Sequence, residues 1–264
     1  TWNPYTFGQS VNLTAVGDSV MFKGDNSGFS VDLSNFIQAE MIGKIAASGS
    51  LAYLLDSNGS IKPLPSYCFA NLFAECSSLV QAPDLPAITL NESCYCRMFY
   101  GCTSLVKAPA LPATTMKDYC YSYMFSGCTS LVKAPALPAT TLAYACYTEM
   151  FLECTSLVKA PALPATTMKD YCYSFMFSEC SSLVQTPILP ATTLAHNCYA
   201  EMFNNCTSLV QASALPATSL ASECYTRMFA GCSSLTQAPA LTAITLIDNC
   251  YNLMFEGCNS LNYV

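Results

Sequence analysis

A 26-residue frame returns without insertion or deletion from Cys68 to Val264, and this regularity constrains the fold more than any other feature. Each copy of the frame opens with a cysteine and carries another cysteine at its ninth position. The opening residues are Cys68, Cys94, Cys120, Cys146, Cys172, Cys198, Cys224 and Cys250. A fixed short period is typical of stacked supersecondary units, which bury a continuous core only together. The sequence therefore predicts a solenoid.

Each repeat divides into two halves of different chemistry. In Thr141–Cys154, the apolar residues Leu142, Cys146, Met150 and Cys154 are four apart, so they would share one face of a helix. The following stretch, Ser156–Pro164, is too short and too rich in proline for a helix. It predicts a short strand over about Leu157–Ala160 and then an extended segment. Each coil is thus expected to pair one helix with one strand.

This unit resembles the BspA-like leucine-rich repeats of Bacteroides surface proteins, through an MF-x-x-C-x-S-L core followed by LP. In one repeat these residues are Met150-Phe151, Cys154, Ser156-Leu157 and Leu163-Pro164, and the resemblance covers about residues 65–264. It implies an α/β right-handed leucine-rich-repeat solenoid. It also implies export to the cell surface or outer membrane, with lipid anchoring as one option.

Residues 1–60 do not follow the repeat. Apolar residues alternate or cluster at Val11–Leu13, Ser19–Phe22 and Phe29–Leu33, which predicts short β-strands. We therefore expect residues 1–60 to form an N-terminal β-rich cap on the first coil, and a separate ligand-binding β-domain is the alternative. Residues 61–264 form the predicted solenoid, with an incomplete last coil. We expect either a continuation of the chain beyond Val264 or a partner that covers this end.

Charge and composition exclude several classes of function. The net charge is −7 and no basic run exists, which argues against binding to nucleic acid. No apolar run approaches the ~18–20 residues that cross a bilayer, so no transmembrane segment is predicted. The only histidine, His196, has no second member for a triad or a metal site. We therefore predict a protein that is not an enzyme, with no catalytic residues and no cofactor.

The seventeen cysteines do not have the spacing of a metal site. Zinc sites place ligands two to four residues apart, whereas seven residues separate the two repeat cysteines. No metal is therefore predicted, and the repeat cysteines are interpreted as small apolar core residues. We expect buried, mostly free thiols, with disulfides between coils as the main alternative. Cys96, the one cysteine off the pattern, is the expected exception.

Two rows of equivalent residues are candidate binding surfaces. The first is a row on the strand, which is either solvated or a cationic face for a partner: Lys107, Lys133, Lys159, Gln185 and Gln211. The second is a set of extra aromatic residues on the predicted helix side, found only in the middle coils: Tyr100, Tyr119, Tyr123, Tyr144, Tyr171 and Phe175. A further aromatic column, from Phe69 to Tyr251, follows the opening cysteines and is expected to be half-buried with its hydroxyls outward.

The sequence thus favours a non-enzymatic surface-binding or adhesion protein, with the repeat solenoid as its scaffold for a protein or a glycan. One alternative is an accessory glycan-binding lipoprotein of an outer-membrane nutrient-uptake complex. Another is a structural spacer. An exposed aromatic pair with polar neighbours would favour glycan binding, whereas a broad footprint on the strands would favour a protein partner.

Overall fold

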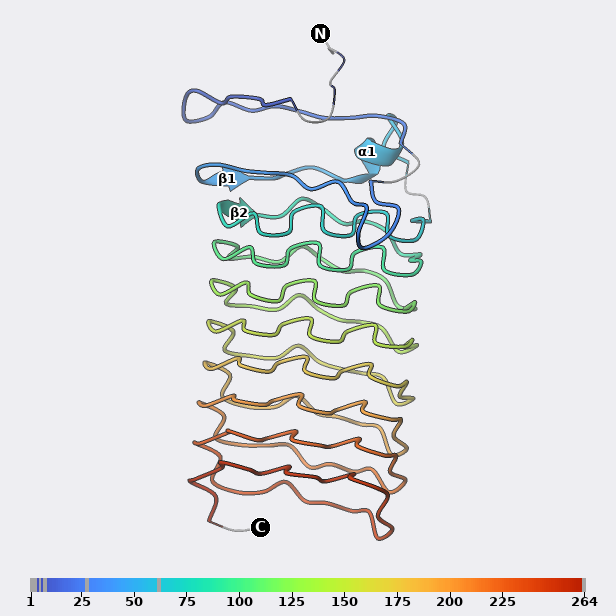
Figure 1. The fold of residues 1–264 in the computed structure, drawn as a ribbon, viewed down its shortest axis with the longest axis vertical. Helices are drawn as coiled ribbons and strands as arrows, with labels where there is room; N and C mark the ends of the chain where they lie inside the picture. The colour runs from blue at the N-terminus through green and yellow to red at the C-terminus, as the bar shows by residue number, and fades with distance from the viewer. Residues whose placement is uncertain (1–3, 5, 7–8, 27–28, 61–62, 263–264) are drawn as a thin grey trace.

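The computed structural model describes residues 4, 6, 9–26, 29–60 and 63–262. It is a rod of stacked coils, with the N-terminal segment across one end and the last coil at the other (Figure 1). In each coil one run of chain meanders as a square wave and the other is smoother. The predicted solenoid is confirmed over these residues, although residues 61–62 at its expected start lie outside the described residues.

The regular elements are few and lie near the N-terminus. Strand β1 (Ile45–Ala46) pairs in parallel with strand β2 (Leu79–Gln81), and helix α1 (Ala52–Leu55) lies between them in the sequence. None of the three strands predicted before residue 40 is formed, and the described part of that stretch has one antiparallel bridge, between Ser30 and Phe36. The described part of the N-terminal segment is therefore not β-rich.

The repeats are not helical, so the predicted helix over Thr141–Cys154 is wrong. In this coil the N–H groups of Thr148 and Met150 each donate to the carbonyl three residues earlier, which closes overlapping β-turns. The intervening N–H groups of Tyr147 and Glu149 donate instead to the facing carbonyls of the next coil. We call this stretch, and its equivalent in every coil, the turn run. Half of its N–H groups join neighbouring coils, whereas a helix would keep them internal.

Every fourth residue of the turn run has left-handed backbone, which an α-helix does not allow. The φ angles of Ala145, Glu149 and Glu153 are 46°, 54° and 60°. Gly127 has φ 73° at the position equivalent to Glu153 in the preceding coil. The apolar residues still recur four apart, so the period was read correctly from the sequence while the element was not. A period of four residues suits both structures, and only the pairing between coils separates them.

The N-terminal segment takes the place of a preceding coil for the first turn run. Because the turn run donates only towards the C-terminus, the first coil has outward carbonyls that need donors. The segment supplies them through four pairs: Phe29 N–H to Cys68 O (2.8 Å), Ser30 Oγ to Ala70 O (2.9 Å), Ala39 N–H to Leu72 O (2.7 Å), and Gln38 Nε2 to Ala74 O. The segment therefore covers the first coil through hydrogen bonds donated by its loops. Within its described part, β1 is the only strand.

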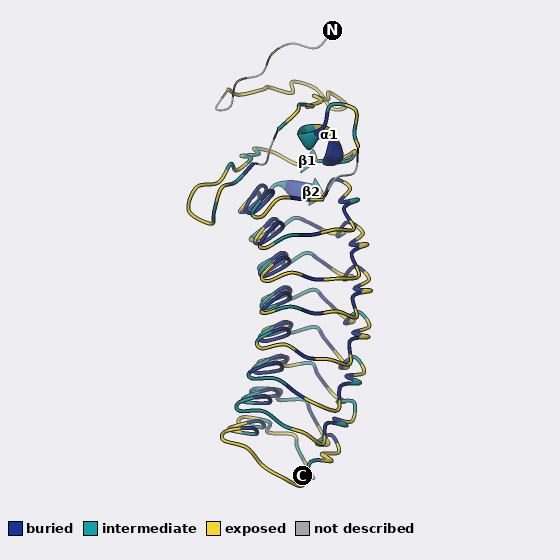
Figure 2. Ribbon diagram, turned by 90° about the vertical axis from the view of Figure 1, so that its right-hand side faces the viewer, coloured by how far each residue is buried: buried dark blue, intermediate teal, exposed yellow. Residues whose placement is uncertain are grey.

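The core consists of columns of identical side chains along the rod. The aromatic column that follows the opening cysteines is stacked, with ring centroids 5.6–5.9 Å apart from Phe69 to Tyr251. Tyr121 and Tyr147 are only 1% exposed, so the expectation of outward hydroxyls is wrong. A parallel phenylalanine column runs from Phe73 to Phe255. In Figure 2 the turn runs carry many of the buried residues, and the exposed residues lie on the outer arcs.

The smoother half of each coil carries the predicted strand in reduced form. Only β2 in the first coil is long enough to be a strand, and later coils pair through single parallel bridges. Examples are Lys107 with Lys133 and Lys133 with Lys159. The prolines that follow remove N–H donors and limit the pairing to a few residues. The α/β helix-and-strand coil is therefore replaced by a coil of turns and bridges.

Candidate binding surfaces

The predicted strand row is exposed and forms two bridged ladders, with no bridge between Lys159 and Gln185. Parallel bridges connect Gln81 to Lys107, Lys133 and Lys159 in turn, and connect Gln185 to Gln211 and Gln237. All the side chains of this row are exposed. The structure therefore brings together the residues predicted for this row: Lys107, Lys133, Lys159, Gln185 and Gln211.

A second exposed row lies directly beside it, and sequence reasoning missed this row. Five valines precede the Lys/Gln positions and are each about half exposed, from 46% to 53%: Val106, Val132, Val158, Val184 and Val210. Adjacent strand residues normally face opposite sides, yet here both rows are exposed. We call the two rows together the strand face. A valine that recurs from repeat to repeat is normally taken for a core residue, so the repeat pattern gave no indication that these valines are exposed.

The charges of the coil are segregated between its two halves. In the six repeats from residue 91 to 246, the smoother halves contain three lysines and no acidic residue. The turn-run halves of the same repeats contain eight acidic and four basic residues, hence a net charge of −4. Asp84 is an acidic residue on the smoother half of a coil, but it lies in the coil that precedes these six repeats. The strand face is thus the basic side of an otherwise acidic rod.

The aromatic residues predicted as an alternative site divide into separate groups. Tyr119, Tyr144 and Tyr171 come together on the outer edge of the turn runs. Tyr100 and Tyr123 instead contact the guanidinium of Arg97, which lies 5.9 Å and 4.8 Å from their ring centroids. Phe175 lies two coils beyond Tyr123 in the same row, with Glu149 in the coil between them. The six residues therefore do not form one patch.

The first group extends to His196 and forms a surface ladder of four rings. Successive centroids lie 5.3 Å apart from Tyr119 to Tyr144, 5.6 Å from Tyr144 to Tyr171, and 5.2 Å from Tyr171 to His196. We call these residues the aromatic ladder. Burial together with a hydrogen bond to Tyr144 raises the pKa of Tyr119 to about 12. The phenol of Tyr119 therefore stays neutral at physiological pH.

His196 is fixed at the end of this ladder by three polar contacts. Its Nδ1 lies 3.1 Å from the carbonyl of Ser222, which can only accept, so Nδ1 carries the proton. Its Nε2 is then the acceptor, and the amide of Asn197 and the hydroxyl of Tyr171 lie within hydrogen-bond distance of it, at 2.8 Å and 3.1 Å. The lone histidine was interpreted from the sequence as offering no catalytic site, and its role here is to end the ladder.

A polar cluster involving Glu149 adjoins Arg97 and Tyr123. Burial raises the pKa of the Tyr123 phenol to about 12, with the hydrogen bond to Glu149 as the second cause. Burial also raises the pKa of Glu149 above its ordinary value, while the hydrogen bond to Tyr123 and the charge of Arg97 oppose this rise. The side chains of this cluster are therefore held in contact with one another.

The thiols are inert for the same physical reason that makes them core residues. All seventeen are free, and sixteen are buried, which agrees with the predicted burial. Cys96 is only 3% exposed, so the expectation that it would be the exception is wrong. At the ninth position, Cys154 Sγ lies 3.1 Å from the carbonyl of Phe125 in the preceding coil, and the equivalent contacts recur from Cys102 to Cys258. Thiols so held are poor nucleophiles.

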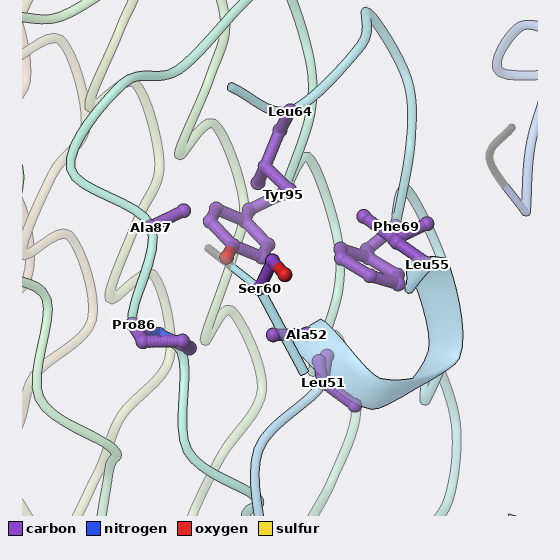
Figure 3. Close-up of a pocket in the computed structure, with 9 residues that line it drawn as sticks. All are labelled: Leu51, Ala52, Leu55, Ser60, Leu64, Phe69, Pro86, Ala87 and Tyr95. Atoms are coloured by element: carbon purple, nitrogen blue, oxygen red, sulfur yellow. The ribbon is translucent and has the colours of Figure 1, made fainter. Parts of the chain in front are cut away.

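The cavity beneath the N-terminal segment cannot hold a substrate. It lies where α1 meets the first coils, between Leu51, Ala52 and Tyr95, and its volume is about 10 Å³ (Figure 3). This is the space of about one water molecule. A second, open hollow of about 350 Å³ lies over the last coils beside Arg227, whose guanidinium pairs with Glu256 at 3.1 Å. The first is too small for any ligand beyond a water molecule, and the second is an open polar hollow on the surface.

Two further features are absent from the described residues. Among them, no group of three or more histidine, cysteine or acidic side chains has a geometry that could hold a metal ion. No helix in this part of the chain is long and apolar enough to span a membrane.

Comparison with protein-family models, with curated proteins and with solved structures finds no match to this chain.

Proposed function

We propose that the protein is a non-enzymatic binding protein of the cell surface and that the strand face holds an acidic protein partner. One observation carries this proposal. A row of half-exposed valines runs beside a ladder of lysines and glutamines, on the side of the coil that has no acidic residue in six successive repeats. Stacked apolar side chains supply area for contact, and the lysines supply attraction and specificity.

The proposal rests on the breadth of the strand face. The rows at Val106 and Lys107 recur in adjacent coils about 4.8 Å apart, so a partner would meet them as one surface. Extended surfaces of this kind are how repeat solenoids commonly bind proteins. The resemblance of the repeat to BspA-like proteins supports the same class of function and a location at the cell surface, with or without a lipid anchor. A spacer would not require a charge-segregated side.

The test is replacement of Lys107, Lys133 and Lys159 together by glutamine. Glutamine already occupies this row in other coils, so the fold should be retained. Exposed charge contacts contribute about 0.2–1 kcal/mol each, so the triple variant should weaken binding by roughly 3- to 150-fold. Binding would be measured by biolayer interferometry against an array of acidic extracellular proteins at ~0.05 M and ~0.5 M salt, since screening should weaken it.

A matched control removes two lysines from the other side of the coil. Lys117 and Lys169 are exposed, lie in the turn-run halves, and carry the same charge. Their replacement by glutamine should leave binding unchanged. The control removes two positive charges and the test variant three, so an equal loss of binding free energy per charge in both would show that only net charge matters. An unchanged affinity of the triple variant would reject the strand face as the site. Binding that persists only for glycans would favour the accessory glycan-binding alternative.

A further inference from the structure

The aromatic ladder is an exposed feature that the fold itself does not require. Tyr119 and Tyr144 are 37% and 40% exposed, Tyr171 and His196 are partly exposed, and all four lie outside the buried columns of tyrosine and phenylalanine. In most other coils their positions carry no aromatic ring, as at Ala145, Ser222 and Asp248, although Tyr67 stands at the position of Tyr119 in the first coil. The repeat therefore folds without rings at these places, and the middle coils have acquired them for another reason.

The rings form a zigzag because they come from two alternating positions. Tyr119 and Tyr171 lie one position before an opening cysteine, whereas Tyr144 and His196 lie two positions before one. The contacts along the ladder are edge-to-face, tilted and edge-to-face, at 68°, 57° and 85°. Neighbouring rings therefore hold one another in place, and the hydrogen bonds of His196 fix the far end. The surface is organised before any ligand arrives.

Charged groups border the rings with a period of two coils. Asp118 accepts the N–H of Tyr144 at 3.0 Å, and Asp170 accepts the N–H of His196 at 3.1 Å. Lysines precede both aspartates, at Lys117 and Lys169, and are exposed. The same Lys-Asp-Tyr unit thus returns two coils later. Two coils correspond to about 10 Å along the rod.

This arrangement fits an extended glycan better than other ligands. A sugar ring has an apolar face of C–H groups that packs on an aromatic ring, and a rim of hydroxyls that pairs with carboxylates, ammonium groups and phenols. A row without a deep pocket suits a linear chain, and its two-coil period is close to the length of an extended disaccharide. The net charge of −4 on the turn-run halves disfavours nucleic acid.

We propose that the aromatic ladder binds a linear, β-linked polysaccharide that lies along the rod, with successive sugar rings packed on Tyr119, Tyr144 and Tyr171. This site is separate from the strand face and does not depend on the function proposed for that face. One molecule can therefore bind a protein on one side and a glycan on the other.

The experiment is calorimetric titration of the full chain with neutral oligosaccharides. The probes are β-1,4- and β-1,3-linked glucose hexasaccharides, a β-1,4-linked N-acetylglucosamine hexasaccharide, and the corresponding disaccharides. We expect at least one hexasaccharide to bind at least tenfold more tightly than its disaccharide. The variants Tyr119→Ala and Tyr144→Ser, which copy other coils, should each weaken it at least tenfold, whereas Tyr144→Phe should retain most of the affinity.

Tyr100→Ala is the matched control, because Tyr100 is also 37% exposed but lies outside the ladder beside Arg97. It should bind as the wild type does, and thermal melts should show all variants folded. Absence of binding to every hexasaccharide, or an equal loss in Tyr100→Ala, would overturn the proposal. The lysine-to-glutamine variant of the strand face should keep glycan binding, so failure of one proposal is distinguishable from failure of the other.

Discussion

Raising the pH should unfold this protein abruptly, because its core is built on thiols. Burial raises the pKa of sixteen cysteine thiols along the rod. The pKa values of Cys96 and Cys172, for example, reach about 12, against an ordinary value of 9.0. These thiols stay protonated in the folded chain at a pH where they would ionise in the unfolded chain.

The sign of the effect follows from proton binding. Above pH 9 the unfolded chain binds fewer protons than the folded chain, so the free energy of unfolding falls as pH rises. Each buried thiol lowers the free energy of unfolding by about 0.4 kcal/mol when the pH equals the pKa of the thiol in the unfolded chain. One pH unit higher, it lowers the free energy of unfolding by about 1.4 kcal/mol. Cys258 is only half-buried, and the other fifteen thiols together lower the free energy of unfolding by about 6 kcal/mol at pH 9 and about 20 kcal/mol at pH 10, against a typical total stability of about 5–15 kcal/mol. Below about pH 8 the thiols are protonated in both states, so none of this stability is lost.

The assay follows far-UV circular dichroism of the reduced protein in argon-purged buffer from pH 7 to 10.5. We expect an alkaline transition between about pH 9 and 10, reversal on return to pH 7, and release of close to one proton per buried thiol on unfolding at pH 10. Replacing Cys154, Cys180 and Cys206 by alanine should reduce this release by about three protons. A melting temperature that is constant from pH 8 to 10.5 would refute the reasoning. Two or fewer reactive thiols in denaturant would show disulfides instead.

Two smaller predictions concern the backbone and the N-terminal segment. Gly127→Ala should lower the melting temperature, because left-handed backbone costs alanine about 1–2 kcal/mol, partly offset by about 0.4–1 kcal/mol of lost freedom in the unfolded chain. Glu153→Gly, at the same position of the next coil, should shift the melting temperature the opposite way, and equal shifts in one direction would exclude backbone strain as the cause. Ser30→Ala should cost about 0.5–1.5 kcal/mol in urea unfolding, since the carbonyl of Ala70 loses its donor. An unchanged midpoint would show that the first coil does not depend on this bond.

The sequence by itself determined the frame of the molecule and the members of its core. A 26-residue period without gaps can be satisfied only by stacking, because a single unit has no partner for its apolar side. The buried residues followed from the same frame, from Cys146 and Met150 to Leu157. The Lys107 row was also predictable, since equivalent positions of adjacent coils must lie side by side.

The aromatic ladder could be predicted only in part. Tyr119, Tyr144 and Tyr171 were recognised as additions to the repeat, but Tyr100 and Phe175 were grouped with them. Which residues meet depends on alternation between two positions in successive coils, and this alternation follows from the backbone of the turn run. The exposed valines were missed because an apolar residue that recurs in successive repeats reads as a core residue, and nothing in its hydrophobicity marks it as exposed.

Only the tertiary structure decided between a helix and a run of turns. Apolar residues four apart suit both, and no local signal separates them in Thr141–Cys154. The turn run leaves half of its N–H groups unpaired within the coil, so an isolated repeat would gain little from it. Those groups are satisfied by carbonyls of the next coil, such as that of Cys172 for Tyr147. Left-handed backbone at Glu149 is therefore stabilised by hydrogen bonds that exist only once the next coil is in place.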